Sequence, residues 1–155
     1  MMQMTQISAI DVDVSMADDV LFIETNSRAL PWSRAMVEDA FEGMGRVLGI
    51  KAEGRLVGYL SYRVTFDEAE VMNIAVLPEF RRRGLAASMM NAYHDKARAS
   101  GAASSFLEVR ASNVSALGLY EKLGYVRAGT RKNYYPLPEG GREDAIVMQR
   151  NLTDA

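Results

Sequence analysis

The sequence contains no cysteine and a single histidine among its 155 residues. Without cysteine there is no disulfide framework, no thiolate nucleophile and no thiolate metal site, and one histidine cannot build a histidine-rich metal centre. No stretch approaches the ~18 apolar residues of a membrane-spanning helix, and the first residues lack the basic region and apolar run of a secretory signal. We therefore expect a cytoplasmic protein with no bound metal and no membrane contact.

Excess positive charge is absent as well. The chain has 18 lysines and arginines against 20 aspartates and glutamates, which leaves a net charge of −2. A large non-specific nucleic-acid surface needs an excess of positive charge, so we expect no direct binding of nucleic acid. Apolar residues make up 48% of the chain, and its length suits one domain with a core of its own. We predict a single domain over residues 1–155.

Apolar periodicity divides the chain into strands and helices. Strands are expected at 8–14, 47–52, 56–66, 70–76, 105–109, 125–133 and 145–150, and helices at 15–26, 33–41, 84–100 and 113–123. Ser15 and Ser33 are expected to cap the first two helices, and Glu53-Gly54 supplies a tight hairpin turn. In the third helix, one apolar stripe contains Leu85, Met89, Met90, Tyr93 and Ala97. The three strands before that helix predict an antiparallel meander, and the strand–helix–strand segment predicts a parallel pair, so the fold class is α/β with a mixed sheet.

A basic turn separates the fourth predicted strand from the helix that follows it. Pro78 has no N–H to donate to a sheet, so the strand should end there. Arg81, Arg82 and Arg83 then precede Gly84, where the helix begins. The first N–H groups of a helix lack partners within it, its dipole favours an anion, and a glycine lets a phosphate approach the backbone. This pattern indicates a phosphate site, although a solvated turn with a helix cap has the same composition.

The spacing in this turn resembles a family signature. Arg81-x-x-Gly84-x-Ala86 fits the Q/R-x-x-G-x-G/A pattern with which the GNAT superfamily of N-acetyltransferases holds the pyrophosphate of coenzyme A. A second pattern of that superfamily, N-x-x-A-x-x-x-Y-x-x-x-G-F/Y, is matched by Asn113, Ala116, Tyr120, Gly124 and Tyr125. Three further runs resemble a narrower group, the ribosomal-protein-alanine N-acetyltransferases. They are Pro31-Trp32-Ser33, Arg131-Lys132-Asn133-Tyr134-Tyr135-Pro136 and Gly141-Arg142-Glu143-Asp144-Ala145.

The resemblance implies the GNAT fold, a mixed and mostly antiparallel sheet with about four helices and two splayed parallel strands. In that fold the pantetheine arm of acetyl-CoA pairs with backbone groups of one splayed strand, here those of Ile74, Ala75 and Val76. The resemblance places the pyrophosphate on the turn and helix start formed by Arg81, Arg82, Arg83, Gly84, Leu85, Ala86 and Ala87. Asn113 has two compatible roles, as helix N-cap and as hydrogen-bond partner of the cofactor.

Two side chains are candidates for the chemistry of acetyl transfer. A carboxylate within the apolar run 106–109 is out of place if both faces of the sheet are covered, and the resemblance makes Glu108 the general base that takes the amine proton. The alternative is a strand-end acid that pairs with Arg110. The resemblance also makes the hydroxyl of Tyr120 the acid that protonates the thiolate of coenzyme A, and the alternative is a half-buried structural tyrosine.

The roles of several other polar residues are less specific. His94 is expected to be solvated or to pack rather than to catalyse. Tyr134 and Tyr135 either shape the mouth of the acceptor site or pack on the sheet. Five acids near the expected mouth either attract a basic peptide or are solvated surface charges: Asp67, Glu68, Glu139, Glu143 and Asp144.

The resemblance implies that the substrate is the alanine N-terminus of a small-subunit ribosomal protein. An α-amino group titrates near ~7.7–8.0 and a lysine near ~10.4, so on the order of a tenth of α-amines are already neutral at pH 7. A single carboxylate base suits such an amine with little further help. Two alternatives stay open, an N-acetyltransferase for lysines or small-molecule amines, and a non-catalytic module that binds coenzyme A.

Overall fold

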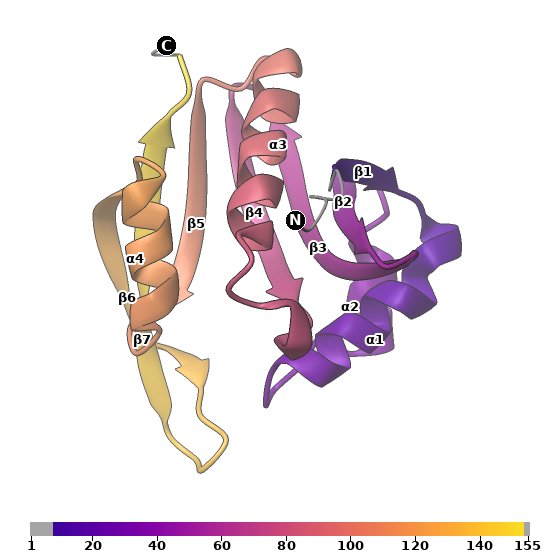
Figure 1. Ribbon diagram of the computed structural model, residues 1–155. Coiled ribbons are helices and arrows are strands. Elements are labelled where there is room, and N and C mark those ends of the chain that lie inside the picture. Colours follow the sequence, from indigo (N-terminus) through magenta and orange to yellow (C-terminus); the bar gives the residue numbers. More distant parts are fainter. Residues whose placement is uncertain (1–7, 154–155) are drawn as a thin grey trace, which may run out of the picture. The chain divides into compact units, whose positions relative to one another are not determined.

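The computed structural model describes residues 8–153 (Figure 1). Seven strands form one sheet in the order β1-β2-β3-β4-β5-β7-β6. The strands are β1 (Ala9–Val12), β2 (Gly45–Ala52), β3 (Arg55–Thr65), β4 (Glu68–Val76), β5 (Ser104–Arg110), β6 (Val126–Pro136) and β7 (Arg142–Asn151). The helices are α1 (Ala17–Ser27), α2 (Arg34–Asp39), α3 (Leu85–Ala99) and α4 (Val114–Lys122), with 3₁₀ turns η1 (Val14–Met16) and η2 (Pro78–Phe80). Every strand and helix predicted from the sequence is present, with ends that differ by a few residues.

The first helix begins later than predicted because Asp13, not Ser15, caps this segment. The Asp13 carboxylate accepts hydrogen bonds from the backbone N–H of Ser15, at 2.9 Å, and from the Ser15 hydroxyl. These bonds cap the turn η1 and engage the Ser15 hydroxyl, so α1 starts at Ala17 without a side-chain cap. The cap at Ser33 is confirmed, because its Oγ accepts a hydrogen bond of 3.3 Å from the N–H of Met36.

The described residues form two compact units. The first unit comprises residues 8–62 and 73–93, and the second comprises residues 63–72 and 94–153. The elements β3, β4 and α3 each contribute residues to both units. Each unit has buried apolar residues of its own. That residues 1–155 act as a single domain stays a prediction.

The first unit packs α3 closely on its strands. Met89 of α3 is fully buried, as the predicted apolar stripe requires, together with Leu48, Ile50 and Leu60 from β2 and β3. A Cβ atom at Gly58 of β3 would lie only 3.1 Å from Cε of Met89, so glycine permits this close approach. Full burial of each such side chain stabilises the fold by about 1.5–3 kcal/mol.

A buried carboxylate joins α1 to two strands of the first unit. Glu24 has no exposed surface. Its Oε1 accepts hydrogen bonds from the Tyr59 hydroxyl at 2.7 Å and from Nδ2 of Asn73 at 3.0 Å, and its Oε2 accepts one from the N–H of Trp32 at 2.8 Å. Nε of Arg28 lies 3.3 Å from the same Oε2. Because a buried charge persists only when it is paired and hydrogen-bonded, these contacts fix α1 and the segment after it on β3 and β4.

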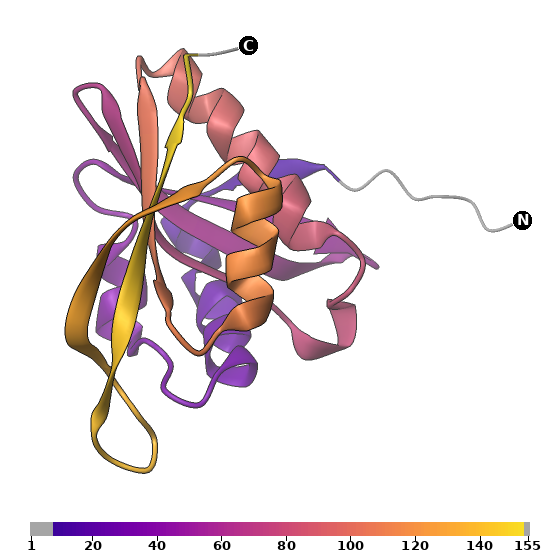
Figure 2. The same ribbon diagram turned by 90° about the vertical axis from the view of Figure 1, so that its left-hand side faces the viewer.

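The second unit is built around β5. Residues 104–106 of β5 pair in parallel with residues 68–70 of β4, and residues 104–110 pair antiparallel with residues 145–151 of β7. The predicted parallel pair and the mostly antiparallel sheet are therefore confirmed. Both Figure 1 and Figure 2 show α4 alongside β6 and β7, with the loop of the β6–β7 hairpin extending beyond the end of that helix.

Candidate functional site

The turn between β4 and α3, in the first unit, has the geometry of an anion site. The strand ends at Val76, ahead of Pro78 as predicted. Gly84 has a left-handed backbone, with φ at +75°, and no heavy atom lies within 4 Å of the position a Cβ would take. The N–H of Ser88 donates to the carbonyl of Gly84 at 3.0 Å. The N–H groups of Leu85 and its two successors precede this first intrahelical bond, so they are free of helical partners beside an open glycine.

The three arginines of this turn differ in their contacts. Nε of Arg81 donates to the carbonyl of Val76 at 3.2 Å, and its Nη2 donates to the carbonyl of Ser27 at 2.7 Å. The Arg83 guanidinium lies 4.8 Å from the centre of the Phe80 ring. Arg82 is exposed, with φ at +64°. Arg81 therefore braces the turn on β4 and α1, and its contact with a phosphate stays a prediction.

The strand segment predicted to hold the pantetheine arm is contacted by two guanidinium groups. Nη2 of Arg28 donates to the carbonyl of Ile74 at 2.8 Å, and Arg81 donates to the carbonyl of Val76 as described. Ala75, between them, is buried. Sequence reasoning missed Arg28 because its partner lies 46 residues away. The backbone role predicted for these three strand residues remains a prediction.

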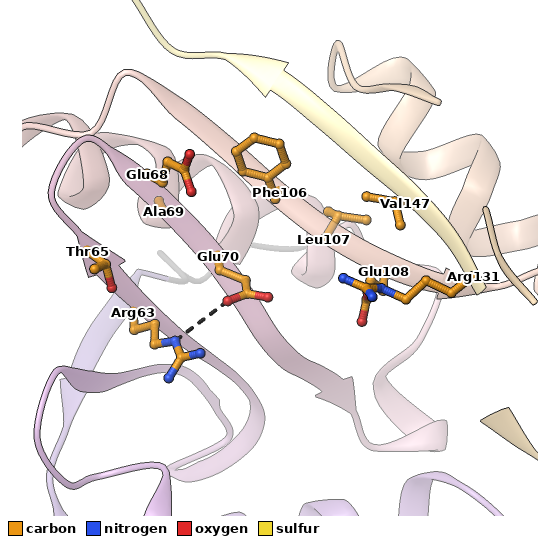
Figure 3. Close-up of a pocket in the computed structure, with 10 residues that line it drawn as sticks. All are labelled: Arg63, Thr65, Glu68, Ala69, Glu70, Phe106, Leu107, Glu108, Arg131 and Val147. Carbon is orange, nitrogen blue, oxygen red and sulfur yellow. Dashed lines mark hydrogen bonds and ion pairs between the residues drawn. The ribbon is translucent and has the colours of Figure 1, made fainter. Parts of the chain in front are cut away.

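A pocket of about 500 Å³ lies in the second unit. Its lining consists of Arg63, Thr65, Glu68, Ala69, Glu70, Phe106, Leu107, Glu108, Arg131 and Val147 (Figure 3). Three carboxylates and two guanidinium groups line it together with apolar side chains. Nε of Arg63 lies 3.6 Å from Oε1 of Glu70. Such a mixture of apolar surface and convergent charges is typical of a site for a small charged group.

Glu108 extends from β5 into this pocket, with 21% of its side chain exposed. It does not pair with Arg110, the alternative considered from the sequence. Instead its Oε2 accepts a hydrogen bond from Nε of Arg131 on β6, and this carboxylate raises the pKa of the Arg131 guanidinium. Arg110 pairs with Glu143, at 3.1 Å. Sequence reasoning placed Arg131 in a family motif but missed its contact with the candidate base.

The helix α4 positions two further candidates, Tyr120 and Asn113. Tyr120 is buried, and its ring meets the ring of Tyr125 edge-on with centroids 5.9 Å apart. Oδ1 of Asn113 accepts a hydrogen bond of 3.1 Å from the N–H of Ala116, so its predicted role as N-cap is confirmed. The cofactor contact of Asn113 and the acid role of Tyr120 stay predictions.

His94 packs within the second unit and is not solvated. It is 1% exposed, and its Nε2 lies 2.7 Å from the Tyr125 hydroxyl, which is also 2.7 Å from the Ser105 hydroxyl. Arg150 donates to Nδ1 at 2.8 Å, which places the ring proton on Nε2. Burial, followed by the charge of Arg150, lowers the pKa of His94 to about 4. The expected packing role is confirmed.

Two of the acids expected near the mouth have structural partners. Glu143 accepts hydrogen bonds from the N–H of Ser112 at 3.0 Å and from Arg110. The pKa of Glu143 is lowered, mostly by a hydrogen bond from the Ser112 side chain and further by the Ser112 N–H and by Arg110. Asp144 accepts a hydrogen bond of 2.9 Å from the N–H of Asn133. Of the five acids, Glu68 is the one that lines the pocket.

The rings of Tyr134 and Tyr135, both on β6, pack against each other. The two rings meet edge-on with centroids 5.0 Å apart. The Arg110 guanidinium lies 4.7 Å from the centre of the Tyr135 ring, and the Arg131 guanidinium lies 5.6 Å from the centre of the Tyr134 ring. Tyr134 remains 44% exposed, so it has surface left for an acceptor.

The sequence of this chain matches a known protein family. A family model described as "Acetyltransferase (GNAT) family" matches residues 17–125. The chain belongs to this family. Membership confirms the predicted superfamily and fold, and it confirms the predicted class of enzyme, an N-acetyltransferase that uses acetyl-CoA.

Relatives of this GNAT protein are similar over most of its length. The ribosomal protein bS18-alanine N-acetyltransferase of Salmonella typhimurium is 42% identical over 129 residues, which cover 81% of this chain and 84% of that protein. The protein of the same name from Escherichia coli K12 is 38% identical over 126 residues, with the same coverage of 81% and 84%.

Solved structures agree with the sequence comparison. The crystal structure of the ribosomal-protein-S18-alanine N-acetyltransferase from Escherichia coli matches this GNAT protein with a TM-score of 0.91 at 33% identity, covering 97% of this chain and 96% of that one. The structure of Arabidopsis thaliana NAA60 in complex with acetyl-CoA matches with a TM-score of 0.85 at 13% identity, covering 96% and 100%. The second match shows the shared fold alone.

The described residues contain neither a cluster of metal ligands nor a membrane-spanning helix. Among residues 8–153, no group of three or more histidine, aspartate or glutamate side chains is arranged to hold a metal ion. Over the same residues, no helix is both long enough and apolar enough to cross a membrane. The cytoplasmic location and the absence of nucleic-acid contacts stay predictions.

Proposed function

We propose that this GNAT protein acetylates the N-terminal α-amine of a small-subunit ribosomal protein of the bS18 type that begins with alanine. The observation that carries the proposal is the similarity, over 81% of the chain, to proteins named for that reaction. The runs 31–33, 131–136 and 141–145 resemble the same group and support the proposal from particular residues.

The first unit holds the donor in this proposal. The N–H groups at the start of α3, the open glycine at 84 and the exposed Arg82 suit the pyrophosphate of acetyl-CoA. The backbone of Ile74, Ala75 and Val76 pairs with the pantetheine arm, and the contacts of Arg28 and Arg81 hold that strand in place. Asn113 is a further candidate for a hydrogen bond to the cofactor.

The second unit supplies the proton transfers. Glu108 takes a proton from the α-ammonium, which leaves a neutral amine to attack the acetyl carbonyl. The new C–N bond forms, the C–S bond breaks, and the Tyr120 hydroxyl gives its proton to the departing thiolate. The attacking nitrogen loses its second proton, which restores the Tyr120 hydroxyl. One proton remains on Glu108 and passes to water, so the reaction releases one proton for each acetyl group transferred.

An assay of thiol release from acetyl-CoA tests the substrate. We expect turnover with an Ala-Arg-initiated peptide, none with the same peptide after its N-terminus is blocked, and little with a peptide whose only free amine is a lysine. Equal rates on the lysine peptide would favour the alternative enzyme, since the fold alone does not separate the two. The absence of turnover on every amine, with acetyl-CoA bound, would favour a non-catalytic module.

A variant at the pocket tests the base. Glu108→Gln is nearly isosteric but cannot accept the proton, so we expect it to bind acetyl-CoA normally and to lose turnover at neutral pH by about 10²–10⁴-fold. The loss of turnover should become smaller as the pH rises toward the pKa of the α-amine, because a larger share of the substrate amine is then already neutral when it binds. Full activity at pH 7 would remove Glu108 from the mechanism.

A further inference from the structure

Arg131 contacts Glu108, the candidate base. Acetyl transfer itself does not require this contact. We propose that Arg131 covers Glu108 while no acceptor is bound, and that the α-ammonium of the substrate displaces this guanidinium to reach the base. The proposal rests on the proposed function, in which Glu108 is the base.

The geometry of the pocket carries this inference. Arg131 and Glu108 both line the pocket, and Figure 3 shows the guanidinium lying against the carboxylate. Nε of Arg131 donates to Oε2 of Glu108. The carboxylate is 21% exposed and the arginine side chain 58% exposed, so the arginine covers an otherwise reachable acid and is itself free to move into solvent. An ion pair of this exposure is weak enough to be exchanged.

An α-ammonium suits the exchange because it offers the same chemistry as the group it replaces. Both are cations that donate N–H groups to a carboxylate, and at pH 7 about nine tenths of α-amines are protonated. A neutral group lacks the charge needed to compete with a guanidinium. The other charged side chains of the pocket are Arg63, Glu68 and Glu70, and Arg63 pairs with Glu70, which leaves Glu68 to favour an incoming cation.

The displaced guanidinium has a second partner in reach. Arg131 already lies 5.6 Å from the centre of the Tyr134 ring, which is 44% exposed. A guanidinium over an aromatic ring is stabilised by a cation–π interaction, so Arg131 can leave Glu108 without losing every contact. This relation gives Tyr134 a role at the acceptor mouth, one of the two alternatives considered from the sequence.

In this proposal Arg131 contacts Glu108 and takes no part in the bonds that form or break. It covers the base between turnovers and leaves it when the acceptor arrives, which makes it a positioning residue and not a catalytic one.

Arg131→Met and Arg131→Gln test the proposal against a matched control on the same strand. Arg127 also lies on β6, is 56% exposed and pairs with Glu121 at 3.5 Å, so Arg127→Met removes an equivalent surface ion pair away from the pocket. Steady-state kinetics with the Ala-Arg-initiated peptide should be measured for each variant between pH 6 and 9, after melting curves show that it folds.

In both Arg131 variants we expect the KM for the peptide to fall by roughly two- to fivefold, the ratio that an exposed ion pair sustains. Arg127→Met should leave this KM unchanged. Arg131→Lys, which keeps the charge, should stay near the wild-type KM.

Two results would overturn the proposal. An unchanged KM in both Arg131 variants would show that Arg131 does not compete for Glu108. A fall in kcat with an unchanged KM would show that Arg131 orients the base in the working complex. Either result leaves the proposed function intact if Glu108→Gln is inactive, whereas an active Glu108→Gln variant refutes the base assignment itself, so the two failures are distinguishable.

Discussion

The hydroxyl of Tyr59 donates a hydrogen bond of 2.7 Å to Glu24, a carboxylate with no exposed surface. Burial, reinforced by the charge of Glu24, raises the pKa of Tyr59 well above its ordinary value, so the hydroxyl stays a donor at every working pH. Four groups contact this carboxylate inside the first unit. The helix that contains Glu24 is therefore fixed electrostatically as well as by apolar packing.

Removal of this hydroxyl should weaken the fold. Tyr59→Phe leaves one lone pair of a buried carboxylate without its donor, and we expect a loss of about 1–3 kcal/mol in the free energy of unfolding. Urea titration followed by circular dichroism measures the change. Tyr134→Phe removes a hydroxyl from a residue that is 44% exposed and should leave stability within about 0.5 kcal/mol. Equal stability of Tyr59→Phe and wild type would show that the bond contributes nothing net.

The anion site at the start of α3 is testable with a pair of glycines. Gly84 and Gly54 have φ values of +75° and +80°, and both have open space where a Cβ would go. Valine at either position is strained by the backbone conformation, so both variants should lose stability to a similar degree. Only Gly84→Val places a branched side chain beside the proposed phosphate position. Calorimetry should therefore show at least a tenfold weaker affinity for acetyl-CoA in Gly84→Val alone, and equal affinities in the two variants would contradict the site.

The acid role of Tyr120 can be separated from its packing role by comparison with its neighbour. Tyr120→Phe keeps the buried ring and should bind both substrates, while turnover falls by about 10²–10⁴-fold. Tyr125→Phe removes a hydroxyl that contacts His94 and Ser105, so it should lose stability and keep turnover within a few-fold of wild type. Single-turnover rates for folded variants give the answer. A wild-type rate for Tyr120→Phe would make Tyr120 purely structural.

His94 predicts a pH dependence of stability with a definite sign. Its pKa falls from 6.5 to about 4 on folding, so the unfolded chain binds a proton below pH 6.5 that the folded protein does not bind until about pH 4. Stability is fully present above pH 6.5 and falls as the pH drops through this window, by about 2–3 kcal/mol at most. His94→Gln keeps an acceptor for Arg150 and a donor for Tyr125 but does not titrate. Urea unfolding at pH 7 and pH 5 should show a smaller difference for the variant, and an equal difference would contradict this role.

Local sequence signals predicted the elements of this fold well. The apolar stripe of α3, the caps at Ser33 and Asn113 and the turn at Gly54 all depend on residues within four positions of one another. Ser15 does not act as a cap because Asp13, two residues earlier, caps the turn η1 and accepts hydrogen bonds from the Ser15 amide and hydroxyl. A choice between two neighbouring polar side chains depends on backbone angles that composition does not reveal.

The candidate site was predictable only in part, because its ion pairs join distant segments. Arg131 and Glu108 are 23 residues apart, and Arg28 and Ile74 are 46 residues apart. Several arginines and acids were available to each partner, and spacing alone could not choose among them. The buried state of His94 was equally hidden, since its donor Arg150 lies on the last strand. Family patterns located the residues, and tertiary structure decided their partners.

The strand order of the second unit has a consequence for synthesis on the ribosome. The last strand, β7, lies between β5 and β6, and it is the element that joins them. Until residues 142–151 emerge, β5 and β6 each present an edge of unpaired N–H and C=O groups, which is a template for aggregation. The nascent chain must therefore protect two edges until the ten residues of β7 are available to pair. A chain that stopped at the β6–β7 loop would keep both edges open, and its yield would depend on chaperones.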